Sequence, residues 1–129
     1  MTGSSVHKGS CLCGDIRFEV SGTLEPAIAC HCTQCRKQTG HYFASSDVPR
    51  AALKVSGNVS WYASSEKVHR GFCGRCGSTL FWDPIKKDRV AVDLGAFDTP
   101  TQTRLKMHIF VASKGDYYDI GDGLPQHER

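Results

Sequence analysis

The sequence of 129 residues lacks the features that mark membrane-spanning, exported and nucleic-acid-binding chains. It has no apolar run approaching the roughly 20 residues of a membrane span, and its mean hydropathy is −0.34. Residues Met1 to Ser10 are small and polar, without the apolar segment of a secretory signal. Lysine and arginine form no run longer than a pair such as Lys86-Lys87. We therefore expect a cytoplasmic chain that has no membrane partner and no nucleic-acid partner.

The number of cysteines is odd, which argues against a disulfide framework. Seven are present, and they fall into three groups: Cys11 and Cys13; Cys30, Cys32 and Cys35; Cys73 and Cys76. Two cysteines separated by one residue in an extended chain lie near the upper distance limit for a disulfide. With no export signal, a reduced chain that binds metal is the better interpretation. Seven thiolates and two divalent ions would also cancel the formal charge of +3.

Helical patterns are scarce, and alternating apolar residues predict a mainly β fold. The strictest alternation covers Asp15–Val20, and a second covers Leu105–Val111. Turn signals separate five further short runs: His41–Val48, Leu53–Ser56, Lys67–Phe72, Thr79–Trp82 and Val90–Phe97. One helical turn is expected at Thr33–Thr39, ended by Gly40. We predict a single domain over residues 1–129 with seven or more short strands.

The third cysteine group resembles a zinc knuckle, because glycines lie inside and after the pair in Cys73-Gly74-Arg75-Cys76-Gly77. In a redox dithiol motif a helix follows the cysteine pair, whereas Ser78–Trp82 has the composition of a strand. The two outlying pairs can form a closed four-cysteine site, which leaves the central three cysteines as a site with an open position. The alternative is that a histidine completes the central site as a second closed one; His41, His69 and His108 are the candidates.

Other residues near the cysteines have two interpretations each. Arg36 and Lys37 directly follow the central group. They either stabilise the metal site or an anionic substrate, or they are solvated surface charges. His31 lies between two expected ligands, and in an extended segment its side chain points away from the metal. Four aromatic residues are either stacking platforms for nucleic acid or part of the core: Trp61, Tyr62, Phe81 and Trp82.

Three ordered motifs resemble the glutathione-dependent formaldehyde-activating enzyme family, also called the centromere protein V/Gfa family. They are Gly9-Ser10-Cys11-Leu12-Cys13-Gly14, Cys30-His31-Cys32-Thr33-Gln34-Cys35-Arg36-Lys37 and Phe72-Cys73-Gly74-Arg75-Cys76-Gly77-Ser78. Agreement extends to Tyr62–Glu66 and His108–Lys114. The resemblance implies a mainly β, Mss4-like fold of short antiparallel strands. It further implies two Zn²⁺ per chain: a structural zinc on Cys11, Cys13, Cys73 and Cys76, and a catalytic-type zinc on Cys30, Cys32 and Cys35.

The resemblance also implies a carbon–sulfur lyase that acts on a small thiol–aldehyde adduct of the S-(hydroxymethyl)glutathione type. In this hypothesis Cys30, Cys32 and Cys35 carry the catalytic site, and the C–S bond breaks to an aldehyde and a thiolate that zinc stabilises. His41 or His69 is a candidate base for the hydroxyl proton. The alternative is a non-enzymatic zinc-binding module that binds a protein or a nucleic acid. Acceleration of aldehyde–thiol exchange separates the two hypotheses.

Overall fold

The computed structural model describes residues 5–129, and it confirms a mainly β fold with one short α-helix. The ten strands are β1 (Val6–Ser10), β2 (Arg17–Ser21), β3 (Ala27–Cys30), β4 (Phe43–Pro49), β5 (Leu53–Ser56), β6 (Val59–Ala63), β7 (His69–Cys73), β8 (Thr79–Asp83), β9 (Arg89–Asp93) and β10 (Leu105–Ile109). Helix α1 spans Thr33–Thr39, as predicted, and ends at Gly40, whose φ is 79°. Three 3₁₀ turns complete the elements: η1 (Arg50–Ala52), η2 (Leu94–Ala96) and η3 (Val111–Ser113).

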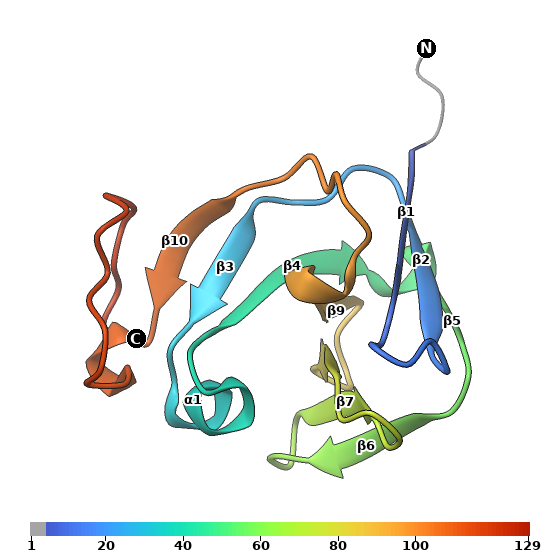
Figure 1. The fold of residues 1–129 in the computed structure, drawn as a ribbon, viewed down its shortest axis with the longest axis horizontal. Helices are drawn as coiled ribbons and strands as arrows, with labels where there is room; N and C mark the ends of the chain where they lie inside the picture. The colour runs from blue at the N-terminus through green and yellow to red at the C-terminus, as the bar shows by residue number, and fades with distance from the viewer. Residues whose placement is uncertain (1–4) are drawn as a thin grey trace.

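The strands form two sheets. The smaller sheet has the order β1-β2-β5, and the larger has the order β10-β3-β4-β9-β8-β7-β6. All neighbours pair antiparallel except β10 and β3, which are parallel. Figure 1 shows the small sheet on one side of the molecule and β10 with the C-terminal tail on the other. Helix α1 directly follows β3, so the central cysteine group lies at the end of that strand.

The main hydrophobic core lies between the two sheets. Phe18 of β2 makes edge contacts with Phe81 of β8 and with Phe97, at ring-centroid distances of 5.6 and 5.2 Å. Ile16 and Val20 join Phe18 in this core, as the alternation of Asp15–Val20 predicted. A smaller apolar cluster contains Cys35, Phe43 and Ala91, with Cys30, Cys32 and Trp82 packed against it. Each group of cysteines therefore borders an apolar cluster.

Several element boundaries differ from the predictions. The expected strand over 90–97 ends at Asp93, because the Asp93 carboxylate accepts a hydrogen bond from the Gly95 N–H and begins η2. The expected strand over 105–111 ends at Ile109, because Phe110 has a φ of 55°. Strands β1, β3 and β6 were not predicted. Among the four aromatic residues Phe81 is buried in the core, whereas Trp61 and Tyr62 are exposed.

The C-terminal tail lies along the outer edge of β10. His108 and Gln126 form a parallel bridge, and the His127 N–H donates to the His108 carbonyl at 2.9 Å. Tyr117 donates its hydroxyl to the Gly40 carbonyl at 2.7 Å, which joins the tail to the end of α1. The tail thus covers an edge strand and contacts the segment that holds the central cysteines. Within residues 5–129, no helix is long and apolar enough to span a membrane.

Candidate metal centres

Two turns bring the first and third cysteine groups together. Cys11 and Cys13 lie in the turn between β1 and β2, and Cys73 and Cys76 lie at the turn from β7 to β8. All four sulfurs lie within 4.8 Å of one another. Cys13 Sγ is 3.6 Å from Cys11 Sγ and 3.7 Å from Cys73 Sγ. Tetrahedral zinc with Zn–S bonds of about 2.3 Å places its sulfurs a little under 4 Å apart, so this set of donors fits zinc.

Local hydrogen bonds favour the thiolate at Cys76 of this four-cysteine cluster. At Cys13 a backbone hydrogen bond from Asp15 lowers the pKa, but burial and contacts with the other three sulfurs raise it to about 12. The Ile16 N–H donates to Cys11 Sγ at 3.3 Å, and the Cys76 N–H donates to Cys73 Sγ at 3.4 Å. The Ser78 hydroxyl lies 3.1 Å from Cys76 Sγ, and its hydrogen bond, with one from the Ser78 backbone, lowers the pKa of Cys76 to about 5. Metal binding requires the thiolate form, so these contacts prepare the cluster for a cation.

The glycines of this turn have two different roles. Gly77 has a φ of 81°, and its N–H donates to the Cys73 carbonyl at 2.8 Å, as a knuckle requires. Gly74 has no positive φ. A Cβ at Gly74 would lie 2.7 Å from Ser60 Oγ, so the close approach of β6 is the reason for glycine there.

The central cysteines form a second cluster at the start of α1. Cys30 ends β3, Cys32 is the N-cap of α1, and Cys35 lies in the first turn of α1. Their three sulfurs lie within 4.8 Å of one another, and no histidine or carboxylate of the described residues joins them. The alternative in which His41, His69 or His108 completes a closed site therefore has no support in this geometry. Three thiolates with one remaining position match an open zinc site.

The pKa values of the three thiols of the central cluster shift in different directions. The pKa of Cys32 lies far below its usual value, because Cys30 and Cys35 hydrogen-bond to its sulfur and the Cys35 N–H donates to it at 3.4 Å. The pKa of Cys30 is raised, first by its hydrogen bonds with Cys32 and Cys35 and then by burial. These contacts therefore favour the thiolate at Cys32 over Cys30 and Cys35, and a bound cation would favour the thiolate at all three.

A cavity of about 660 Å³ opens beside the central cluster. Cys30, Cys32 and Cys35 line one part of it, and most of the remaining surface is carbon. Its size falls within the range of small-molecule sites. The cavity therefore gives a small molecule access to the side of the cluster that has no fourth protein ligand.

Arg70 is a site residue that the sequence analysis missed. It lies in β7, is only 6% exposed, and lines the cavity. Its Nη1 lies 3.6 Å from Cys35 Sγ and donates to Gln38 Oε1 at 2.9 Å. Its Nε is buried without a partner among the described residues. A buried guanidinium beside Cys35 supplies positive charge next to the cluster. Arg36 and Lys37, unlike Arg70, do not line the cavity.

A hydrogen-bonded chain holds the segment between Cys30 and Cys32. His108 Nε2 donates to Asp122 Oδ2 at 2.7 Å, and His108 Nδ1 is 2.8 Å from His31 Nε2. The Tyr118 hydroxyl contacts His31 Nδ1. Because the carboxylate accepts from His108, His31 donates to His108 and accepts from Tyr118. Burial keeps His31 neutral by lowering its pKa to about 4. Both of its ring nitrogens have other partners, and it joins neither cysteine cluster.

The two histidines considered as a general base do not line the cavity. His69 Nε2 lies 3.3 Å from Asp83 Oδ2, and its ring stacks on Trp61 at 4.5 Å. His41 packs against Tyr42 and Tyr118, at centroid distances of 4.5 and 4.2 Å. Neither position suits proton transfer at the central cluster. The polar groups that do line the cavity include the hydroxyls of Ser64 and Ser65 beside Arg70.

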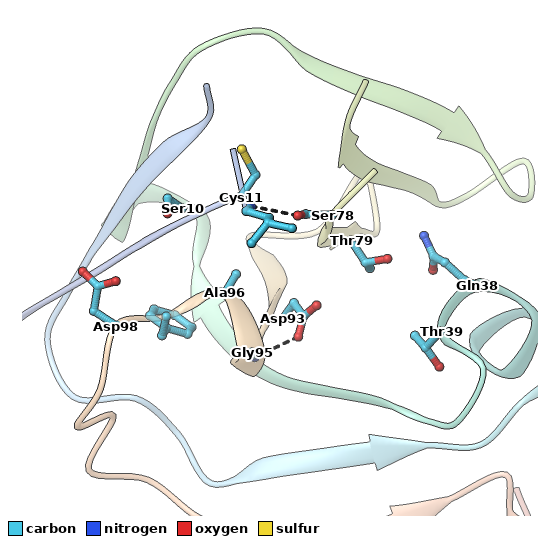
Figure 2. Close-up of a pocket in the computed structure, with 12 residues that line it drawn as sticks. Ser10, Cys11, Gln38, Thr39, Ser78, Thr79, Asp93, Gly95, Ala96 and Asp98 are labelled. Carbon is cyan, nitrogen blue, oxygen red and sulfur yellow. Dashed lines mark hydrogen bonds between the residues drawn. The ribbon is translucent and has the colours of Figure 1, made fainter. Parts of the chain in front are cut away.

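A second hollow of about 610 Å³ lies between the four-cysteine cluster and the end of α1. Figure 2 shows Asp93 in this hollow, facing the region of Gln38 and Thr39, with Cys11 at its far end. Burial raises the pKa of the Asp93 carboxyl to about 6, although the hydrogen bond from Gly95 opposes this shift. No cysteine of the central cluster lines this hollow, so it is separate from the larger cavity.

These features define a class of protein: a small β protein with one group of four cysteines, one group of three, and a cavity beside the group of three. The chain belongs to the glutathione-dependent formaldehyde-activating enzyme family, whose model matches residues 6–113. The matched residues contain all seven cysteines and Arg70.

Similar proteins support this assignment. An uncharacterized lyase of Schizosaccharomyces pombe is 26% identical over 118 residues, which cover 90% of this chain and 86% of the relative. A Halomonas elongata protein, provisionally named a glutathione-dependent formaldehyde-activating enzyme, is 29% identical over 125 residues, with 88% and 80% covered. The crystal structure of a Rhodobacter sphaeroides protein has a TM-score of 0.61 at 21% identity and covers 77% of this chain and 99% of that one. The last similarity concerns the fold alone.

Proposed function

We propose that this protein is a zinc-dependent carbon–sulfur lyase acting on a small thiol–aldehyde adduct of the S-(hydroxymethyl)glutathione type. The observation that carries the proposal is the cluster of Cys30, Cys32 and Cys35, which has no fourth protein ligand among residues 5–129 and opens into a cavity. Family membership and the lyase named among the relatives support an enzymatic role. Structural zinc on Cys11, Cys13, Cys73 and Cys76 is the companion proposal.

The reaction cleaves the carbon–sulfur bond of the adduct. The hydroxyl proton leaves, the oxygen lone pair forms the carbonyl of the aldehyde, and the C–S electron pair leaves with sulfur as a thiolate. Zinc held by the three cysteines would stabilise that thiolate as a Lewis acid. A free thiol with a pKa of about 8.5 is mostly protonated at neutral pH, so stabilising its anion favours cleavage.

Residues of the cavity supply the other requirements of this reaction. Arg70 lies beside Cys35, where its positive charge stabilises negative charge that develops near the cluster. Ser65 lines the same cavity, and its Oγ accepts from the Lys67 and Val68 N–H groups, which leaves its own proton to orient the substrate oxygen. The neighbouring Ser64 hydroxyl donates to the Val68 carbonyl. The Asp122–His108–His31 chain keeps the Cys30–Cys32 segment in one conformation.

The test is to follow aldehyde–thiol exchange by NMR in the fully zinc-loaded protein, with a panel of thiols that includes glutathione. We expect exchange faster than the uncatalysed rate for at least one thiol, and loss of that acceleration in Cys32→Ser. Serine is a good N-cap residue, so this variant keeps the start of α1. No acceleration with any thiol would refute the lyase and leave a zinc-binding module as the function.

A further inference from the structure

We propose that the thiol released or captured by this protein is apolar, an alkyl or aryl thiol, rather than glutathione. The inference rests on the proposed function, because it names the thiol that fits the cavity beside the central cluster. Two observations carry it: the apolar character of the cavity, and the pairing of the charged side chains that line it.

The wall of the cavity is mostly carbon. Seven apolar side chains supply it: Ile28, Phe43, Val68, Trp82, Ala91, Ile109 and Phe110. Phe43 belongs to the buried cluster that also contains Cys35, so the apolar surface reaches the sulfurs themselves. A substituent on the substrate sulfur would therefore lie against carbon, where an alkyl or aryl group gains from burial.

Each charged group of the cavity already has at least one partner, although Arg70 Nε has none among the described residues. Only Asp47, Arg70 and Arg89 of the described residues bring charge to its lining. Arg89 Nη1 donates to Asp47 Oδ1 at 2.9 Å, and the Arg89 guanidinium lies over the Trp82 ring at 5.4 Å from its centroid. Arg70 is held by Gln38 and Cys35, and its charge opposes that of the thiolate cluster. Both arginines of the lining are thus already in contact with other side chains.

Glutathione does not match these contacts. It carries two carboxylates and one ammonium group, and each loses its hydration when it enters a cavity. One carboxylate would have to compete with Asp47 for Arg89, and the other with Cys35 and Gln38 for Arg70. An uncharged thiol of similar length needs neither exchange.

The activity test compares hydroxymethyl adducts of phenylmethanethiol, butanethiol, mercaptosuccinate and glutathione, each relative to its own uncatalysed exchange rate. We expect kcat/KM for the two apolar adducts to exceed that for glutathione and mercaptosuccinate by about tenfold or more. Equal or greater kcat/KM for glutathione would overturn this inference and leave the lyase intact. No acceleration with any adduct would instead refute the proposed function.

A binding measurement gives a readout that needs no turnover. Benzyl methyl sulfide and S-methylglutathione are thioethers without a hydroxymethyl group, so neither can be cleaved. We expect benzyl methyl sulfide to shift the methyl NMR signals of Ile28, Val68 and Ile109, and S-methylglutathione at the same concentration to leave them in place. Shifts with S-methylglutathione alone would contradict the inference.

A matched pair of variants tests the role of charge directly. Val68 is half-buried on the loop before β7 and lines the cavity. Val68→Lys adds a cation there, and Val68→Met adds similar length without charge. We expect Val68→Lys to raise the ratio of glutathione to phenylmethanethiol kcat/KM several-fold, and Val68→Met to leave the ratio near that of the wild type. An equal change in both variants would show that charge does not determine the preference.

Discussion

Substitution of the exposed cysteine in the four-cysteine cluster is the sharpest test of a structural metal. Cys13 is exposed, whereas Cys11 and Cys73 are each 2% exposed in the main core. Without a metal, Cys13→Ser changes an exposed side chain by one atom and should alter the free energy of unfolding by less than about 0.5 kcal/mol. With a metal, the same change removes one of four ligands from a site that joins the β1–β2 turn to the β7–β8 turn.

The expected magnitude follows from the worth of structural zinc. Such sites contribute about 10–16 kcal/mol in small zinc-binding peptides, comparable to the whole stability of about 5–15 kcal/mol of a domain. Loss of one thiolate therefore needs to remove only about 4 kcal/mol to lower Tm by roughly 15 °C in a chain of this length. Cys32→Ser keeps the N-cap of α1 and lies outside the main core, so it should lower Tm by no more than about 5 °C.

Differential scanning calorimetry and metal analysis of the two variants provide the assay. Both should retain one zinc per chain, and Cys76→Ser should reproduce the large loss of Cys13→Ser. Addition of a chelator should bring the wild type down to the Tm of Cys13→Ser. Equal losses of Tm in Cys13→Ser and Cys32→Ser would refute the division into a structural and a catalytic-type site.

Three further predictions concern stability, pH and turnover. Gly9→Ala should lower Tm by about 5–10 °C in calorimetry, because the added Cβ would overlap Phe18 Cζ. Lys8→Ala on the same strand is the control. An unchanged Tm in Gly9→Ala would contradict the close packing at this position. Because burial raises the pKa of Asp93 to about 6, the folded state binds this proton more tightly than the unfolded state, and stability present at low pH is lost as pH rises through 6. Asp93→Asn should therefore stabilise the protein by about 2 kcal/mol at pH 8 and by less at pH 5; a gain in Tm that is equal at both pH values would be the contrary result. Arg70→Met should lower kcat/KM for adduct cleavage about 10- to 100-fold and Arg70→Lys less, whereas unchanged turnover in Arg70→Met would remove Arg70 from the reaction.

The sequence predicted those elements whose pattern is local. The alternation of Asp15–Val20 placed Ile16, Phe18 and Val20 in the core, and Gly40 ended the predicted helix. Strand β1 was missed because its two inward residues are His7 and Gly9, which do not form an apolar alternation. Glycine is required at position 9 by Phe18 and by the carbonyl of Ala96, and contacts over such a separation leave no local pattern.

The cysteine groups of the site could be predicted from their spacing in the sequence. The residues around them could not, because they are brought there by tertiary contacts. The spacing of the cysteines indicated groups of four and three, which the structure brings together in space. Arg70 was missed because a charged residue in a short strand usually faces solvent, whereas here it faces the sulfurs. The partners of His31 are His108 and Tyr118, which lie 77 and 87 residues further along the chain. Such pairings follow from the parallel placement of β3 and β10 and from the docked tail.

The different roles proposed for the two clusters come from their surroundings, since their ligands are alike. Cys11 and Cys73 are buried in the main core, and the same two turns supply Cys13 and Cys76, so four sulfurs are available and a metal there would need no further ligand. The central cluster uses one short segment, and three ligands from α1 and the end of β3 leave one direction open to the cavity. Arg70 on β7 adds a positive charge beside the cluster. Hydrogen bonds of His108, Asp122 and Tyr118 hold the segment between Cys30 and Cys32 through His31. The four-cysteine cluster thus joins two turns of the fold, whereas the three-cysteine cluster faces a cavity of small-molecule size.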